Sequence, residues 1–378
     1  MKHGWPYKKV KDVCEKGSSN IQQNKIVNIN GEYAVYGASG YVQNVDFYHQ
    51  KSPYIGIVKD GSGVGRVNVY PAKTSLLGTM QYIIPKPCVS MGYIAYALKG
   101  LNLSKFASGA AIPHIYFRDY GECNVPVPSM DIQNAICKEL DALSLIIEKK
   151  KEQIKCLDEL SQAIFYDMFG DPVENNKGWN VKTLGNLSVK IANGYNAKLE
   201  EDTYKSEGIM YFRCQNVWRN RFDYSDLVYI DEATNRMMKS SSLKHNDLLI
   251  TKIGRVNTEN SSLGRVSLYE GEDDKANLSG NLCFVRLKNE VNCKFVLYIL
   301  VSNQFRDYIR RTTVGGIDKR ALNVKQISSF PIIQPPITEQ EKYASRVEAI
   351  ERQKELINQS ILEAQTLLDA RMDYWFGE

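Results

Sequence analysis

Two stretches of the chain carry an apolar residue at alternating steps of four and three positions. Eight of the ten stepped positions are apolar from Ile136 to Met168, and again from Tyr343 to Trp375. A 3.5-residue apolar period over more than four heptads, with Glu and Lys between, is typical of a coiled-coil seam. We therefore predict two long helices that pack on each other through Ile136, Leu140, Leu143, Ile147, Ile154, Leu157, Ile164, Val347, Ile350, Ile357, Ile361 and Leu368. In the alternative, each helix packs on its own globular region.

The ends of these helices predict how they run. A proline with a capping residue precedes each helix, at Pro128-Ser129 and at Pro336-Ile337-Thr338, and a glycine follows each, at Gly170 and Gly377. Only the short, turn-rich segment 171–178 separates the first helix from the next globular region. The second helix must therefore run back along the first, which makes the pair antiparallel, and about 33 helical residues would span roughly 50 Å.

The helices belong to an internal repeat that covers the chain. Trp5 corresponds to Trp179 at an offset of 174, and Gly65-Arg66-Val67 corresponds to Gly264-Arg265-Val266 at an offset of 199. Pro128 and Pro335 are 207 residues apart, as are the two helical patterns. We predict an α+β fold with a pseudo-two-fold internal repeat, in which a coiled-coil spacer of two long antiparallel helices separates two globular domains. The predicted boundaries are 1–130, 131–170, 171–335 and 336–378.

Each globular region contains short runs of β-branched and aromatic residues between glycines or prolines, which predict strands. These runs are Tyr33–Tyr36, Tyr54–Val58, Gly65–Tyr70 and Gln81–Ile84, then Met210–Phe212, Leu248–Thr251, Gly264–Leu268 and Leu282–Leu287. Glycine-dense loops such as 59–66 follow some of them, and such loops let backbone N–H groups approach a phosphate. Taken singly, they are also consistent with ordinary hairpin turns.

Composition places the chain among globular proteins of two or three domains, with 378 residues, 43% hydrophobic and 24% charged. No apolar run approaches the roughly 20 residues of a bilayer span, and the first residues do not resemble a signal peptide, so we expect a cytoplasmic protein. The eight cysteines form no Cys-x-x-Cys pair, which favours buried thiols over a metal site.

The net charge of +5 is divided unevenly along the chain. Residues 1–130 and 179–330 carry +7 and +6, whereas residues 131–178 and 331–378 each carry −4. Only the basic regions suit a polyanion such as a nucleic acid. Their candidate contacts are Lys59, Ser62, Arg66, Lys105, Tyr195, Asn196, Arg213, Gln215, Asn216, Lys252, Arg255, Arg265, Arg310, Arg311 and Arg320. A solvated charged surface is the simpler interpretation of any one of them.

The sequence lacks the common catalytic motifs. It contains no P-loop, no H-E-x-x-H and no nucleophile elbow with partners, and its four histidines are scattered without ligand spacing. We therefore expect a binding protein with no catalytic residue, no metal and no cofactor of its own.

Repeated basic domains joined by repeated helices resemble the specificity (S) subunit of type I restriction–modification systems. Residues 33–40 with Asp60-Gly61 and Gly65, followed by Ser108–Pro113 and Val127-Pro128, resemble one common variety of its target-recognition domain. Residues 243–254 and 316–336 resemble the other variety, and the helix ends Phe169-Gly170-Asp171-Pro172 and Trp375-Phe376-Gly377 also match. The similarity covers essentially the whole chain, with 1–130 and 171–335 as recognition domains.

The resemblance implies a division of labour. Each recognition domain would read one half of a bipartite, asymmetric site in double-stranded DNA, and the helices would set the spacing and dock two methyltransferase (M) subunits. Those subunits would bring S-adenosylmethionine and methylate adenine, while restriction (R) motor-nuclease subunits would cut unmethylated DNA. Because the target base would be flipped into the partner's pocket, this chain would need no catalytic residue.

Two other functional classes remain open at this stage. One is a cytosolic coiled-coil scaffold that bridges two proteins without binding DNA, and the other is an enzyme with an unrecognised nuclease or methyltransferase site. Two smaller expectations follow from the sequence. The acidic segment Glu270–Asp274 should face away from DNA, and the apolar residues Leu145, Ile146 and Phe165, which lie off the seam, should be exposed in the isolated chain.

Overall fold

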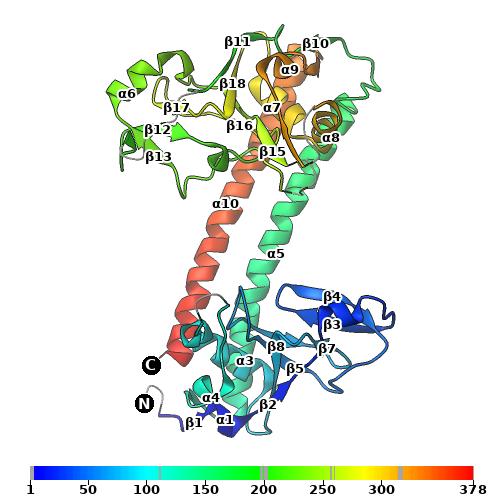
Figure 1. The fold of residues 1–378 in the computed structure, drawn as a ribbon, viewed down its shortest axis with the longest axis vertical. Helices are drawn as coiled ribbons and strands as arrows, with labels where there is room; N and C mark the ends of the chain where they lie inside the picture. The colour runs from blue at the N-terminus through cyan, green and yellow to red at the C-terminus, as the bar shows by residue number, and fades with distance from the viewer. Residues whose placement is uncertain are drawn as a thin grey trace. The chain divides into compact units, whose positions relative to one another are not determined.

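The computed structural model describes residues 4–109, 112–195, 199, 203–255, 258, 260–313 and 318–377. The chain divides into two compact units. Unit 1 comprises residues 1–153 and 356–378, and unit 2 comprises residues 154–355. Each unit therefore contains one globular region together with a part of each long helix (Figure 1).

The two long helices are present, as the heptad pattern predicts. Helix α5 spans Met130–Phe169 and α10 spans Ile337–Phe376, with 40 residues in each. In unit 2, Asp158 pairs with Lys354 and the ring of Phe165 packs on Tyr343, so partner numbers fall along α10 as they rise along α5. In unit 1, the early part of α5 packs on the late part of α10 through Glu139 and Arg371. The helices are therefore antiparallel within each unit.

Every residue of the predicted seam lies on a covered face of its helix. Ile136, Leu140, Ile147, Val347 and Ile350 are buried. The others are half-buried, namely Leu143, Ile154, Leu157, Ile164, Ile357, Ile361 and Leu368.

The apolar residues outside the seam behave differently from one another. Leu145 and Ile146 are 52% and 44% exposed, as expected. The expectation for Phe165 was wrong, because Phe165 is only 5% exposed. Its ring stacks on Phe295 of the globular region, with centroids 5.9 Å apart. The globular region therefore covers a face of α5 that the heptad pattern does not assign to the contact with α10.

The globular region of unit 1 contains three small sheets. A four-stranded antiparallel sheet has the order β2-β8-β5-β6, and a three-stranded sheet has the order β4-β3-β7, with β3 and β7 parallel. Strands β1 and β9 form a separate pair. The strands are β1 Tyr7–Lys9, β2 Cys14–Ser18, β3 Tyr33–Gly37, β4 Gly40–Val45, β5 Tyr54–Val58, β6 Val67–Tyr70, β7 Ser75–Leu76, β8 Met80–Pro85 and β9 Asn124–Pro126. The helices are α1 Val10–Val13, α2 Gln23–Ile26, α3 Met91–Gly100, the 3-10 helix η1 Leu103–Phe106 and α4 Phe117–Tyr120.

The globular region of unit 2 repeats this topology. Its sheets have the orders β11-β18-β14-β16, β13-β12-β17 and β10-β20, and β12 and β17 are again parallel. The strands are β10 Val181–Thr183, β11 Ser188–Asn193, β12 Ile209–Phe212, β13 Val228–Ile230, β14 Leu248–Thr251, β16 Val266–Leu268, β17 Ala276–Leu278, β18 Leu282–Leu287 and β20 Pro331–Ile333. Unit 2 adds the pair β15 Ile253–Arg255 and β19 Lys319–Ala321. Its helices are η3 Cys214–Asn216, α6 Glu232–Met237, η4 Lys239–Ser241, α7 Cys293–Val301, α8 Asn303–Thr312 and α9 Val324–Ser328.

A buried glutamine fixes each long helix to its globular region. In unit 1, Gln133 accepts a hydrogen bond from the N–H of Ser90 at 2.8 Å and donates to the Pro128 carbonyl at 3.0 Å. In unit 2, Gln340 accepts from the N–H of Asn292 at 3.1 Å and donates to the Pro335 carbonyl at 2.9 Å. Ser90 and Asn292 cap α3 and α7, so the repeat extends to individual side-chain contacts.

The cysteines only partly follow the expectation of buried thiols. Cys14 and Cys283 are buried, and burial raises the pKa of each to about 12, whereas Cys88 and Cys156 are exposed. No group of three His, Cys, Asp or Glu side chains that could hold a metal ion occurs among the described residues. In the same part of the chain, no helix is both long enough and apolar enough to cross a membrane.

Candidate nucleic-acid interface

In unit 1, the glycine-rich loop 59–66 is folded against η1. Gly61, Gly63 and Gly65 all have positive φ, which favours glycine. A Cβ at Gly65 would lie 2.5 Å from the backbone nitrogen of Ser104, so only glycine allows this approach. The N–H of Gly61 also bonds to the Pro113 carbonyl at 2.9 Å. The loop is therefore held beside Lys105 of η1.

These contacts gather the four candidate residues of the first domain on neighbouring segments. Ser62, Arg66 and Lys105 are exposed, and Lys59 is half-buried. Arg66 donates to the Ala38 carbonyl at 3.0 Å, and the Lys59 ammonium lies 3.4 Å from Asp60. We call Lys59, Ser62, Arg66 and Lys105 the unit 1 basic surface.

Sequence reasoning missed one residue that contacts this loop from another segment, His114. The imidazole of His114 is hydrogen-bonded to the carboxylate of Asp60, and its ring lies 4.2 Å from that of Tyr116. Asp60 and His114 also form a backbone bridge. A scattered histidine gives no motif, so only the folded structure reveals that this pair fixes the base of the loop.

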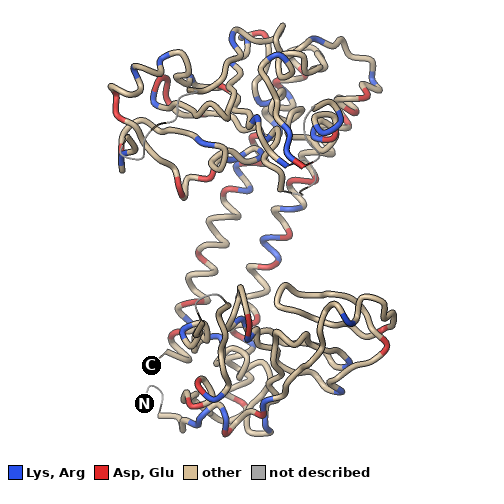
Figure 2. The backbone as a smooth tube through the Cα atoms, in the orientation of Figure 1, with Lys and Arg blue, Asp and Glu red and all other residues tan. Residues whose placement is uncertain are grey.

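In unit 2, the corresponding loop follows β14 and also brings cations together. Gly264, the first residue of the Gly-Arg-Val sequence, again has positive φ, and β15 pairs with β19. Arg320 of β19 donates to the carbonyls of Arg310 and Thr313 at 2.7 and 3.1 Å, which ties β19 to the end of α8. Lys252, Arg255, Arg310, Arg311 and Arg320 therefore lie on adjoining segments, which we call the unit 2 basic surface, and Figure 2 shows Lys and Arg gathered around β15 and α8.

Few acidic groups balance the unit 2 basic surface. Arg310 lies 3.2 Å from Asp307, and Arg255 lies 3.4 Å from Asp318. Lys252 donates to Asn193 at 2.7 Å, and desolvation lowers its pKa. Arg311 is exposed and donates to the Asp307 carbonyl at 3.3 Å. The surface retains a net positive charge.

A second group of candidates is fixed by one carboxylate. Arg213, Gln215 and Asn216 all donate to Asp226, at 3.4, 3.1 and 2.8 Å. Asn216 is completely buried, so it shapes the loop and presents no surface to a ligand. Tyr195 is half-buried and bridges to Ser279, and Asn196 lies outside the described residues.

Arg265 is also placed differently from the sequence hypothesis. It is only 7% exposed, it donates to the Ser261 carbonyl at 3.0 Å, and its guanidinium lies 3.9 Å from the ring centre of Trp218. Its main role is therefore to support the loop beneath the basic surface. The neighbouring Arg219 is half-buried, and burial together with Arg306, Arg265 and Arg310 lowers its pKa to about 10.

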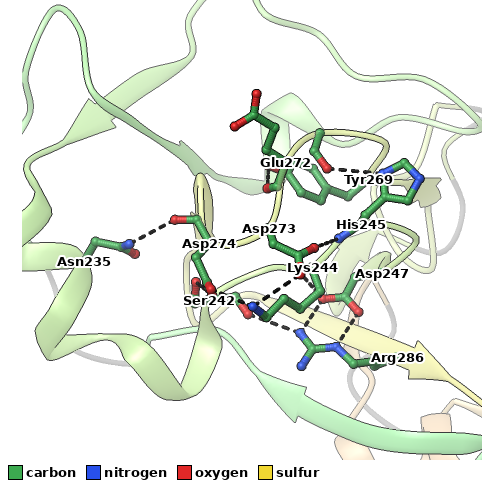
Figure 3. Close-up of polar contacts among 11 residues, drawn as sticks. Asn235, Ser242, Lys244, His245, Asp247, Tyr269, Glu272, Asp273, Asp274 and Arg286 are labelled. Carbon is green, nitrogen blue, oxygen red and sulfur yellow. Dashed lines mark hydrogen bonds and ion pairs between the residues drawn. The ribbon is translucent and has the colours of Figure 1, made fainter.

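The acidic segment 270–274 is folded into a local network (Figure 3). Lys244 lies 2.5 Å from Asp274 and 3.4 Å from Asp273. Because its charge is paired with these two carboxylates, Lys244 does not form a basic patch of its own. Hydrogen bonds from Lys244 and Ser242 lower the pKa of Asp274. Beneath the turn, Arg286 donates two hydrogen bonds to the buried Asp247, at 2.9 and 2.7 Å. The orientation of this segment relative to DNA stays a prediction.

The two basic surfaces occupy equivalent positions in the repeat. Each combines the loop after the third strand of its four-stranded sheet, β5 or β14, with the segment after the helix α3 or α7. The four-stranded sheets and the helices α3 and α7 correspond, but η1 in unit 1 is replaced in unit 2 by α8 and the β15–β19 pair, and the exposed side chains differ. Each unit therefore presents its own set of cations and hydrogen-bond donors that could contact a polyanion.

Comparison with known proteins gives a consistent result. Residues 2–156 and 176–366 match the family described as the type I restriction modification DNA specificity domain. The StySPI specificity subunit of Salmonella potsdam is 22% identical over 308 residues, which are 76% of this chain and 64% of that relative, slightly less than two thirds. The MjaIX specificity subunit of Methanocaldococcus jannaschii is 22% identical over 385 residues, covering 92% of this chain and 86% of the relative.

Solved structures share the fold. The crystal structure of a type I restriction–modification S subunit from M. genitalium aligns with a TM-score of 0.59 at 15% identity, covering 99% of this chain and 96% of that one. A chain from a structural study of complex assembly and conformational transition in the type I system aligns with a TM-score of 0.54 at 16% identity, over 99% and 98%. The sequence match extends over most of the chain and contains both repeats, so this protein belongs to the type I restriction–modification DNA specificity family.

Proposed function

We propose that this chain is the DNA-recognition subunit of a type I restriction–modification complex, and that each unit reads one half of a bipartite, asymmetric site. The observation that carries the proposal is the basic surface found at the equivalent position in both units. Lys and Arg bind phosphates and fix the register on the duplex, while Arg, Gln and Ser side chains can contact base edges. The family membership supports the same function.

The two half-sites should differ in sequence. The unit 1 basic surface is built on a glycine loop and η1, whereas the unit 2 basic surface includes the additional β15–β19 pair and the arginines at the end of α8. Different donor groups at equivalent positions read different bases. An asymmetric site follows from a repeated framework with two distinct surfaces.

The catalytic steps belong to other subunits in this proposal. Two methyltransferase subunits dock on the helices, carry S-adenosylmethionine and methylate adenine, and restriction subunits cleave DNA. This chain contributes recognition and no catalytic group, and the complex acts in the cytoplasm. Support comes from the large apolar side chains exposed on the helices, such as Leu145, Leu356 and Leu367, which are 52%, 68% and 50% exposed. In this proposal these side chains are covered when the methyltransferase subunits dock.

The test is to co-express the chain with the methyltransferase encoded beside it and to map methylated adenines in the host genome by long-read sequencing. We expect methylation at one split motif on both strands, with both half-sites read at once. The proposal would be contradicted by a stable complex that leaves the genome unmethylated and whose retention of DNA is lost at every salt concentration. That result would favour a scaffold.

A further inference from the structure

The three-stranded sheet of each unit contains a hairpin whose tip differs between the repeats. Strand β3 leads to β4 in unit 1, and β12 leads to β13 in unit 2, within two sheets that have the same strand order and the same pairing (Figure 1). The unit 1 tip comprises residues 37–41, whereas the unit 2 tip comprises the longer segment 213–227. The repeat therefore keeps the hairpin and varies its tip.

The same arginine of the repeat contacts the tip in each unit. Arg66 and Arg265 are equivalent, since each is the middle residue of a Gly-Arg-Val sequence that leads into β6 or β16. Arg66 donates to the Ala38 carbonyl of the unit 1 tip at 3.0 Å. The guanidinium of Arg265 lies 3.9 Å from the ring centre of Trp218 in the unit 2 tip. The two tips are thus equivalent in a tertiary contact as well as in topology.

The unit 2 tip ends in a tight turn from Trp218 to Arg221 that is fixed on β16. The N–H of Trp218 donates to the Arg221 carbonyl at 3.0 Å, and Asn220 has positive φ, which asparagine tolerates. The N–H of Asn220 donates to the Val266 carbonyl at 2.9 Å. The hydroxyl of the buried Ser267 faces the carbonyls of Trp218 and Arg221, at 2.9 and 2.8 Å. These contacts hold the backbone of the turn in one conformation.

The guanidinium of Arg221 is held in place while its donors remain exposed. Arg221 is an exposed residue, and its guanidinium lies 4.9 Å from the ring centre of Trp218. It forms no ion pair within the part of the chain that the structure describes. The nearby Asp223 accepts hydrogen bonds from Ser225, which are the main causes of its lowered pKa. A stacked guanidinium with exposed donors has the planar geometry that binds O6 and N7 of guanine.

The unit 2 tip adjoins the unit 2 basic surface. Burial, followed by the charges of neighbouring arginines that include Arg310 of this surface, lowers the pKa of Arg219 to about 10. The tip and Arg265 together carry four arginines against two aspartates. One of these aspartates, Asp226, is occupied by Arg213 and by two amide side chains of the tip. Hydrogen-bond donors therefore outnumber the carboxylates that could occupy them.

The unit 1 tip presents different side chains beside the unit 1 basic surface, to which Arg66 belongs. Tyr41 is 62% exposed, and its ring packs edge-on against Tyr36, with centroids 6.3 Å apart. The Tyr36 ring lies 4.8 Å from that of the buried Tyr70, so the aromatic core supports Tyr41. Ser39 is exposed at the turn itself. Hydroxyl groups and an aromatic ring offer a base edge other contacts than a guanidinium does.

We infer that these two tips read the bases of the two half-sites, with Tyr41 of the unit 1 tip at one half-site and Arg221 of the unit 2 tip at a guanine of the other. The inference rests on the proposed function and assigns its two kinds of contact. Contacts to phosphates fix the register on the duplex and carry no sequence information, whereas contacts to base edges do. The basic surfaces bind phosphates, and the tips beside them supply the differing base contacts. Arg66 and Arg265 are positioning residues.

The test measures base discrimination by the full chain in complex with its methyltransferase. A labelled duplex that carries the mapped split site competes with duplexes that each have one changed base pair. Arg221→Ala should reduce discrimination at least tenfold at one G·C pair of one half-site, and Tyr41→Ala should do so within the other half-site. Arg236→Ala and Tyr7→Ala are the matched controls, because they change exposed residues of the same types in the same units but outside the tips.

The positioning role of Arg265 has its own readout. Arg265→Met should reduce discrimination at the same base pair as Arg221→Ala, because Trp218 loses the cation that supports it. Arg265→Lys should retain this discrimination, since it keeps a cation beside the ring. Unchanged reading of the other half-site shows that the rest of each variant is folded. A merely structural role would weaken binding to every duplex equally.

The outcomes separate the inference from the proposed function. If the unmodified complex binds no split site, the proposed function fails. If it binds one, and Arg221→Ala and Tyr41→Ala both keep full discrimination at every base pair, the proposed function stands and the tips are refuted as reading elements. Variants that act on the same half-site, or that weaken binding to all duplexes equally, would refute them as well.

Discussion

Glu139 of α5 forms an ion pair with Arg371 of α10, and it thereby fixes the last turns of the chain to the start of the first long helix. One guanidinium nitrogen of Arg371 lies 3.0 Å from Glu139, and the indole N–H of Trp375 donates to the same carboxylate at 3.2 Å. The ring of Trp375 in turn stacks on Trp5, with centroids 5.8 Å apart. The two ends of the described chain are therefore joined within unit 1.

This ion pair predicts how the stability of unit 1 depends on pH. The hydrogen bond from Arg371 is the largest of the causes that lower the pKa of Glu139 in the folded state. A lowered pKa stabilises the fold above the unfolded value of about 4.3, and this stability is lost as the pH falls through the folded pKa. Glu139→Gln should therefore flatten the decline in melting temperature below about pH 5.

Melting curves of the wild-type and variant chains between pH 7 and pH 3 test this. Glu148→Gln is the matched control on the exposed face of the same helix, and it should retain the wild-type decline. An unchanged slope in Glu139→Gln would show that the pair contributes nothing to acid sensitivity.

The Arg286–Asp247 pair predicts a large loss of stability in unit 2. Asp247 is completely buried, and Arg286 donates two hydrogen bonds to it. Removing one partner of a buried pair leaves an uncompensated charge, so Arg286→Met should lower the free energy of unfolding by about 3–5 kcal/mol. Lys244→Met, which removes a more exposed pair with Asp274, should cost much less, because solvent screens that pair. Urea unfolding curves measure both, and similar costs would show that burial does not decide the difference.

The unit 2 basic surface predicts a specific dependence of DNA binding on salt. If Arg310 and Arg311 each neutralise one phosphate, the double change to alanine should reduce the slope of log K against log salt by about 1.8. Lys239→Ala is the control, because Lys239 is an exposed cation in η4 and outside the basic surface. Anisotropy titrations of the methyltransferase complex over a range of KCl concentrations provide the slopes. Equal slopes in all three proteins would remove these arginines from the phosphate contacts.

The periodic and repeated features of this fold could be predicted from the sequence. The heptads predict α5 and α10, and apolar runs such as Leu248–Thr251 predict the central strands, because burial on both faces leaves a clear pattern. The edge strand β2, with the sequence Cys-Glu-Lys-Gly-Ser, was missed because it is mostly exposed and polar. Phe165 was misassigned because a heptad pattern describes one neighbouring helix and not a third element.

For the candidate site, the sequence predicts the residue types that are available but not which side chains are exposed to a ligand. Arg265 and Asn216 have the residue types of DNA contacts, but the fold uses them inside loops, against Trp218 and Asp226. Conversely, Asp60 and His114 lie far apart in the sequence and meet only in the folded loop. The residue types determine which contacts with DNA are chemically possible. The tertiary contacts determine which of these side chains remain exposed to make them.

The helix pair predicts a change in the DNA gap when both helices are lengthened together. In unit 1 the two helices are antiparallel, so the pair Glu139–Arg371 places residues near 359 opposite Glu152. Inserting four residues after Glu152 and four after Gln359 adds about 6 Å of helix. If the helices set the spacing between half-sites, the tolerated gap should grow by about two base pairs, since each pair spans roughly 3.4 Å.

Methylation mapping of a library of sites with varied gaps tests this ruler role. The half-sites themselves should be unchanged, because the insertions leave both basic surfaces intact. The matched control inserts the four residues in α5 alone. This change shifts the apolar positions of α5 by four residues relative to those of α10, so we expect it to abolish the complex. An unchanged gap in the doubly lengthened chain would show that the helices join the two recognition domains without setting their spacing.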